Sequence, residues 1–152
     1  MRVMFDSNAY DAILKHGDAE RISALISADK ISVITTHIQE DEIRKNPEKD
    51  EREALLSIFF RLTTNRKNTP SALWDLSKWG ESSWAGPEES FRLSAIQRNR
   101  PTKSEDEVLG TAAEKYCDVF VTEDKKFAAR LTSAAPHIRV LTYSAFRAEF
   151  LT

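Results

Sequence analysis

Residues 106–127 read DEVLGTAAEKYCDVFVTEDKKF, and this stretch decides the fold. The spacing of Ser104 and Glu107 is that of a capping box, so a helix is predicted from residue 104 to about residue 116. The apolar run over 119–122 is rich in β-branched and aromatic residues and predicts a short buried strand. A helix that leads into such a strand is typical of a parallel α/β unit.

The same alternation extends in both directions along the chain. Further strands are predicted over 2–5, 31–34 and 138–141. Helical patterns cover 9–14, the residues after Asp18, those after Thr36, 51–64, 123–135, and the C-terminal residues through 150. Strands that are so short and apolar must be covered on both faces. The sequence therefore predicts a three-layer α/β/α fold with a central parallel sheet of four or five strands.

Composition limits the classes of protein that this chain can belong to. Its 152 residues, of which 41% are hydrophobic, suffice for one domain over 1–152. The single cysteine, Cys117, allows no internal disulfide, which fits a reducing cytoplasm. No long apolar run predicts a membrane span. The formal net charge is −2, so any polyanion would have to be bound by a local patch.

The segment from about 65 to 101 differs from the rest of the chain. Trp74, Trp79 and Trp84 are evenly spaced within it, among glycines and serines, and a helix is predicted from Pro87 to Ile96. The tryptophans could stack on unpaired bases, although at least two of them are expected in the core or an interface. We treat the segment as a divergent part of the single domain.

Acidic residues follow the predicted strands at the points where each strand ends. Asp6 and Asp124 come directly after strands, Glu42 lies in the helix after the second strand, and Asp106 lies at the start of a helix. Because parallel strands present their carboxyl ends at one edge, these four carboxylates are expected to converge there. Clustered carboxylates need a cation, and oxygen ligands favour Mg²⁺ or Mn²⁺.

Each acid also has a purely structural interpretation. Asp6 and Asp124 could cap helices, and Asp106 could place a favourable charge in a first helical turn. Glu42 could pair with Lys45 or Asn46 on a solvated face. Only the ordered set of four favours a functional site.

Three stretches carry a family resemblance: RVMFDSNAYDAIL at 2–14, ITTHIQEDEI at 34–43, and the stretch from 106 to 127. Together they resemble the PIN-domain nucleases, including toxins of the VapC type. In that family the first strand ends in an aspartate, a helix carries a glutamate, and a later aspartate opens a helix that leads to a strand ending in Thr-x-Asp. The matching residues here are Asp6, Glu42, Asp106 and Asp124.

The resemblance implies a PIN-like fold and divalent-metal-dependent ribonuclease activity that leaves a 5′-phosphate and a 3′-hydroxyl. It implies that Asp6, Asp106 and Asp124 bind Mg²⁺ or Mn²⁺, with Glu42 holding the bound water or acting as a further ligand. It also implies an antitoxin protein that covers the site, and it favours a homodimer.

Other polar residues could assist this site. Asn8 and Thr122 could orient a carboxylate or a bound water, or could serve turn chemistry alone. Arg98, Arg100 and Lys103 stand just upstream of Asp106 and could neutralise RNA phosphates, or could belong to an ordinary solvated loop.

Two rival functions remain open from the sequence. One is a catalytically silent PIN-like module that binds RNA or protein. The other is a metal-dependent phosphatase of a different α/β fold, which is disfavoured because Asn8 stands where an Asp-x-Asp nucleophile motif needs its second aspartate.

Overall fold

The computed structural model describes residues 1–69 and 104–152, with the side chain of Ser104 left out. The predictions made for the three tryptophans, for the helix from Pro87 to Ile96, and for Arg98, Arg100 and Lys103 therefore lie outside the described residues.

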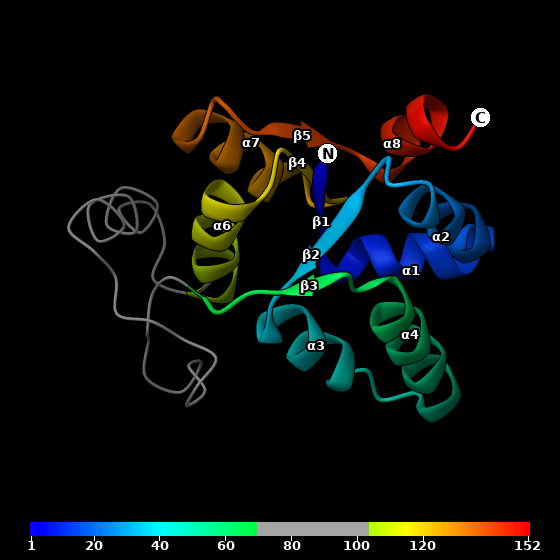
Figure 1. The fold of residues 1–152 in the computed structure, drawn as a ribbon. Helices are drawn as coiled ribbons and strands as arrows, with labels where there is room; N and C mark the ends of the chain where they lie inside the picture. The colour runs from blue at the N-terminus through cyan, green and yellow to red at the C-terminus, as the bar shows by residue number, and fades with distance from the viewer. Residues whose placement is uncertain (70–103) are drawn as a thin grey trace.

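A sheet of five parallel strands forms the centre of the molecule, in the order β3-β2-β1-β4-β5 (Figure 1). The first strand along the chain is thus the middle strand of the sheet. Strand bounds are β1 Arg2–Phe5, β2 Ser32–Thr35, β3 Asn65–Arg66, β4 Val119–Val121 and β5 Arg139–Leu141. The predicted parallel sheet is confirmed.

Helices cover both faces of this sheet. In the described ranges they are α1 Ser7–His16, α2 Ala19–Ser27, α3 His37–Arg44, α4 Lys49–Leu62, α6 Ser104–Tyr116, α7 Lys125–Ala134 and α8 Tyr143–Phe150. One core cluster joins the sheet to α1, α2, α4 and α8, and the other joins it to α6 and α7. Figure 1 shows these two groups on opposite sides of the strands. The three-layer α/β/α prediction is confirmed.

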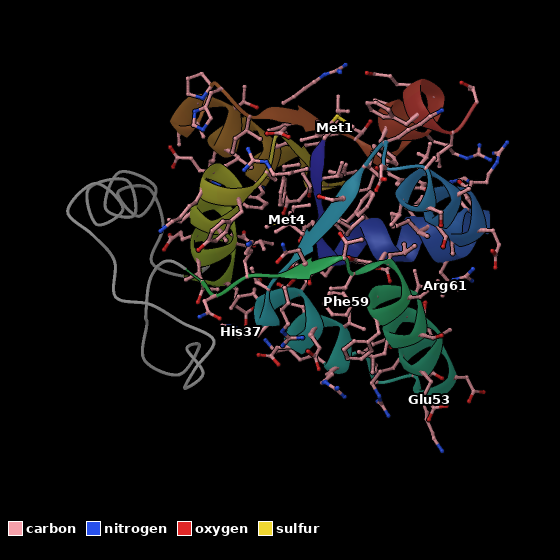
Figure 2. The ribbon with its side chains drawn as sticks, in the orientation of Figure 1. Met1, Met4, His37, Glu53, Phe59 and Arg61 are labelled. Carbon is pink, nitrogen blue, oxygen red and sulfur yellow. The ribbon has the colours of Figure 1, made fainter. Side chains whose placement is uncertain are left out.

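Alternation of side chains along each strand produces the two cores. Val3 and Phe5 of β1 pack into the first cluster, whereas Met4 between them packs into the second. Figure 2 shows Met4 and Phe59 inside the molecule, whereas Glu53 on the same helix as Phe59 points outward. No helix in the described ranges is long and apolar enough to cross a membrane.

Several predicted boundaries were wrong by one or two residues. The helix predicted over 51–64 is α4, which ends at Leu62 because Thr64 leaves it to donate its backbone N–H to Val33 in β2. The helix predicted over 123–135 begins only at Lys125, because Asp124 is its N-cap. Strand β3 has two exposed polar residues and carried no periodic signal.

Candidate active site at the carboxyl edge of the sheet

Asp6 lies where β1 and its neighbour β4 end side by side. Phe5 of β1 is in register with Val121 of β4, so the next residues, Asp6 and Thr122, are neighbours. The Thr122 hydroxyl donates a 2.7 Å hydrogen bond to Asp6 Oδ2, and Asn8 Nδ2 donates another of 3.0 Å to the same oxygen. Only 7% of Asp6 is exposed. The strand register places this carboxylate, and the two side-chain hydrogen bonds hold it with one oxygen already bonded twice.

The burial of Asp6 has an electrostatic consequence. Removal from water raises the pKa of Asp6 above its usual value, and the nearby charge of Asp106 raises it further. Hydrogen bonds from Thr122, from the Ser7 backbone and from Asn8 lower the pKa and so oppose this rise. Burial therefore disfavours the ionised form of Asp6, and a bound cation would stabilise that form.

Asn8 connects the two chain segments that form this edge. Its Nδ2 reaches Asp6, and its Oδ1 accepts a 2.9 Å hydrogen bond from the backbone N–H of Glu123. The amide therefore ties the start of α1 to the loop between β4 and α7. Asn8 and Thr122 thus both contact Asp6, and their predicted orienting role remains a prediction.

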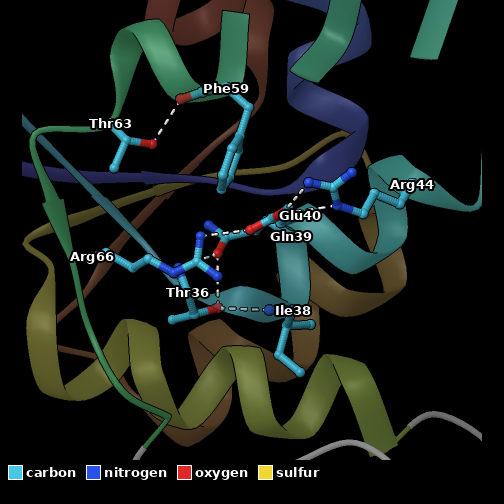
Figure 3. Close-up of polar contacts among 8 residues, drawn as sticks. All are labelled: Thr36, Ile38, Gln39, Glu40, Arg44, Phe59, Thr63 and Arg66. Atoms are coloured by element: carbon cyan, nitrogen blue, oxygen red, sulfur yellow. Dashed lines mark hydrogen bonds and ion pairs between the residues drawn. The ribbon is translucent and has the colours of Figure 1, made fainter. Parts of the chain in front are cut away.

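Helix α3 brings Glu42 to the same edge. Thr36 and Gln39 form a capping box at its start, and Gln39 Nε2 donates a 2.9 Å hydrogen bond to the carbonyl of Phe5 at the end of β1. Figure 3 shows the capping box of Thr36 and Gln39, together with the ion pairs of Glu40 with Arg44 and Arg66. These contacts hold α3 beside the residue that precedes Asp6.

Glu42 is the most perturbed acid of the group. Its Oε2 atom is buried and has no hydrogen-bond partner among the described residues. Burial raises the pKa of Glu42 to about 7, and the charges of Asp6, Glu105 and Asp106 contribute, against a hydrogen bond with the Ser7 side chain. Lys45, which the sequence offered as a structural partner of Glu42, hydrogen-bonds Glu105 instead, although the charge of Glu42 also raises the pKa of Lys45.

Asp106 stands in the first turn of α6 and has a cationic neighbour on α7. Its Oδ2 accepts a 3.0 Å hydrogen bond from Arg130. Its charge is close enough to raise the pKa of both Asp6 and Glu42. Asp6, Glu42 and Asp106, which are remote in sequence, are thus electrostatic neighbours in the fold.

Asp124 has a visible structural task. Its Oδ1 accepts 2.9 Å hydrogen bonds from the backbone N–H groups of Lys126 and Phe127, which caps α7. Its own N–H donates to Thr122 Oγ1, the hydroxyl that also bonds Asp6. The capping interpretation of Asp124 is therefore correct, and its role as a metal ligand stays a prediction.

Two residues of this region were missed by the sequence reasoning. Glu105 precedes Asp106 and adds a negative charge beside Glu42, while Arg130 supplies the counter-ion of Asp106. Glu105 could have been found by its place in the same first turn of a helix. No local pattern marks Arg130, because its pairing with Asp106 depends on how α6 packs on α7.

A groove of about 520 Å³ adjoins the site between α1, α3 and α4. Glu42 and Ser7 form its boundary with the site, and Asp11, Glu48 and Glu51 give its wall an acidic character. Burial raises the pKa of Asp11, and the charge of Glu51 adds to this rise. The groove is therefore an unfavourable place for a polyanion.

The donor set has the chemistry of a site for a hard divalent cation. Its ligands are carboxylate oxygens, and Glu42 Oε2 is buried and free to accept a ligand bond. In the described ranges, however, no three His, Cys, Asp or Glu side chains form a group that could hold a metal ion as they stand. The residues fit Mg²⁺ or Mn²⁺ by chemistry, and binding would require side chains such as Asp106 to exchange partners.

Comparisons with known proteins address the fold. No protein-family model matches the sequence, and no curated protein is similar to it in sequence. Among solved structures, a chain in the crystal structure of VapBC2 from Rickettsia felis, bound to a DNA fragment from their promoter, matches with a TM-score of 0.53 at 14% identity. The match covers 93% of this chain and 98% of the other. Together with the sheet order and the three layers, it shows that this protein has a PIN-like fold of the VapC type.

Proposed function

We propose that this protein is a Mg²⁺- or Mn²⁺-dependent ribonuclease. One observation carries the proposal: the buried, unpartnered Oε2 of Glu42 lies within electrostatic reach of Asp6 and Asp106 at the carboxyl edge of a PIN-like sheet. Such a cluster of like charges costs folding free energy, and a bound cation would repay it. Asp6, Asp106 and Asp124 are the proposed metal ligands.

Asp6 and Glu42 would have different roles in the reaction. Asp6 is held in one orientation by Thr122 and Asn8, which avoids reorganisation during the reaction. Glu42, with a pKa of about 7, can accept a proton from water near neutral pH. A bound divalent cation would supply charge stabilisation for the phosphodiester and activate the water.

In the proposed hydrolysis, a water oxygen bonds to phosphorus while Glu42 takes the proton. The bond between phosphorus and O3′ breaks, and O3′ leaves with a proton from solvent. The products are a 5′-phosphate and a 3′-hydroxyl, as the family resemblance implies.

The test is cleavage of a single-stranded RNA with Mg²⁺, Mn²⁺ or EDTA. Asp6→Asn should lower the rate by about 10²-fold or more, and EDTA should abolish cleavage. Asp118→Asn is the matched control, because Asp118 pairs with Arg2 at the other end of β1 and β4. Cleavage that persists in EDTA and in the Asp6 variant would reject this mechanism.

A silent binding module is the second candidate, and specific contacts favour it. Asp106 is engaged by Arg130, Asp124 caps α7, and the described side chains form no ready group of three metal-ligating residues. Calorimetry separates the two candidates: a nuclease should bind Mn²⁺ in a way that Asp6→Asn weakens. A silent module should give the same heats for wild type and variant.

A partner protein completes the proposal. The matched crystal structure contains a VapBC2 complex, and the present chain has the same type of fold. We propose that this protein is a cytoplasmic toxin covered by an antitoxin, and that it forms a homodimer. Inducible expression of the wild type alone should arrest growth, whereas Asp6→Asn should not. Sedimentation of the purified chain would test the dimer.

A further inference from the structure

Arg130 is a cation placed directly beside the acidic cluster. It projects from α7, its guanidinium lies 5.7 Å from the ring centroid of Phe127, and its Nη2 is 3.0 Å from Asp106 Oδ2. The side chain is 27% exposed, so it can reach solvent without unfolding the helix. Arg130 therefore belongs to the site by position, although its residue type and spacing gave no sequence signal.

Close packing of α6 on α7 produces this position. Gly110, one turn after Asp106, faces Phe127 and Leu131, and an added Cβ there would lie 3.4 Å from Phe127 Cε2. A methyl group at 110 would thus be in ordinary van der Waals contact with the ring over which Arg130 lies. The packing of α6 on α7 therefore brings Arg130 and Asp106 side by side.

The charges around the cluster are unevenly compensated. Glu105 has Lys45 as a partner, and Asp106 has Arg130. Among the described residues, no ion pair reaches Asp6 or Glu42. A cation drawn to these two acids would compete with Arg130 for Asp106.

We propose that Arg130 is an exchangeable counter-ion, which pairs with Asp106 in the absence of divalent cation and with an RNA phosphate in its presence. The inference rests on the proposed function. Partly exposed ion pairs are weak, so Arg130 can leave Asp106 at small cost. A guanidinium can form two parallel hydrogen bonds with a phosphate, which makes RNA the better partner once Asp106 is engaged elsewhere.

The first test is Mn²⁺ calorimetry with Arg130→Gln. Removing a competitor should tighten Mn²⁺ binding by about two- to fivefold. Arg139→Gln is the matched control, because Arg139 forms an ion pair with Glu149 on α8 and loses the same charge. Weaker or unchanged Mn²⁺ binding in Arg130→Gln would overturn the proposal, since it would show that Arg130 only positions Asp106 or packs α7.

The second test is RNA binding in a Glu42→Gln background, where cleavage is slow. At saturating Mn²⁺, Arg130→Gln should weaken RNA binding about tenfold, and Arg130→Lys should restore part of it. In EDTA, the Gln substitution should change RNA affinity by less than about twofold. An equal loss with and without Mn²⁺ would contradict the exchange.

A third measurement needs no variant and so does not depend on folding of a mutant. In wild type, a Mg²⁺ titration should shift the Arg130 Nε–H signal in NMR spectra and leave the Arg139 signal in place. If wild type binds no divalent cation at all, both this inference and the proposed function fail. If it binds one in an Asp6-dependent way while the Arg130 signal does not move, only this inference fails.

Discussion

At the scale of one residue, Glu42 shows the free-energy cost of a buried carboxylate at the candidate site. A carboxylate with one oxygen buried and unpartnered is unfavourable in a folded protein, because it loses hydration without gaining a hydrogen bond. Its pKa of about 7 is a measure of that penalty. Acids with strongly perturbed pKa values are typical of active sites, which supports the proposed role of Glu42.

Glu42→Gln should therefore stabilise the protein at pH 8 in EDTA. In the folded state the pKa rises from 4.5 to about 7, so between these values the folded chain binds more protons than the unfolded chain. The contribution of Glu42 to the free energy of unfolding is thus largest below the lower value and is lost as the pH rises through the upper one. The variant should gain up to about 3 kcal/mol at pH 8 and little at pH 4.

Thermal melts across this pH range measure the effect. The control is Glu53→Gln, because Glu53 is exposed on α4 with only a loose pair to Lys49. If wild type and Glu42→Gln show parallel stability profiles from pH 4 to pH 8, the carboxylate is solvated and the burial argument is wrong.

Thr122→Val tests the hydrogen bond that orients Asp6. Valine has nearly the same shape but cannot donate the 2.7 Å bond to Asp6 Oδ2, so the pKa of Asp6 should rise further and Mn²⁺ affinity should fall by about fivefold. Thr132→Val is the control, because that hydroxyl bonds a carbonyl within α7 on the surface. Equal Mn²⁺ affinities for the two variants would remove Thr122 from the site.

At the scale of elements, one residue can serve a helix and a site together. Asp124 starts α7 by accepting two backbone N–H groups, and the same start sets the direction of the helix that carries Arg130. The capping interpretation is thus observed, whereas the metal-binding role that the sequence left as its alternative has to be tested separately.

Asp124→Asn separates these two tasks. Asparagine caps helices about as well as aspartate but carries no charge, so stability should change by less than about 0.5 kcal/mol while RNA cleavage falls at least tenfold. Thr142→Ala removes the cap of α8 instead and should cost about 1 kcal/mol with cleavage intact. Full cleavage by Asp124→Asn would restrict Asp124 to capping.

An element could be predicted from the sequence only where its own residues carry a pattern. Strands such as β1 are apolar and end at an acid, so both the strand and Asp6 were visible in the residue pattern. Strand β3 pairs only through Asn65 and Arg66, and its placement depends on β2 rather than on its own composition. Arg130 was invisible for the same reason, because long-range packing alone brings it to Asp106.

At the scale of the whole molecule, charge is distributed unevenly around the site. The groove lined by Asp11, Glu48 and Glu51 lies on the α4 side, whereas Arg130 lies on the α7 side. An RNA strand should therefore leave the site over α7 and avoid the groove. The net charge of −2 conceals this asymmetry, so it could not be read from composition.

Neutralising the groove should favour RNA. The double variant Glu48→Gln/Glu51→Gln should bind RNA about two- to fourfold more tightly at low salt, with the gain shrinking as salt is added. Glu53→Gln, on the same helix but outside the groove lining, should have a smaller effect. An identical gain in RNA affinity from the double variant and from Glu53→Gln would indicate a general charge effect rather than an effect of the groove.

The central position of β1 has a consequence for synthesis of the protein. Its neighbour β2 follows within the first forty residues or so of the chain, but its other neighbour, β4, begins at Val119. Until these residues have folded against β1, Asp6 has neither the hydrogen bond from Thr122 nor the neighbouring carboxylate of Asp106. The proposed nuclease would therefore stay inactive during synthesis until residues 106 to 122 have left the ribosomal exit tunnel and packed against β1.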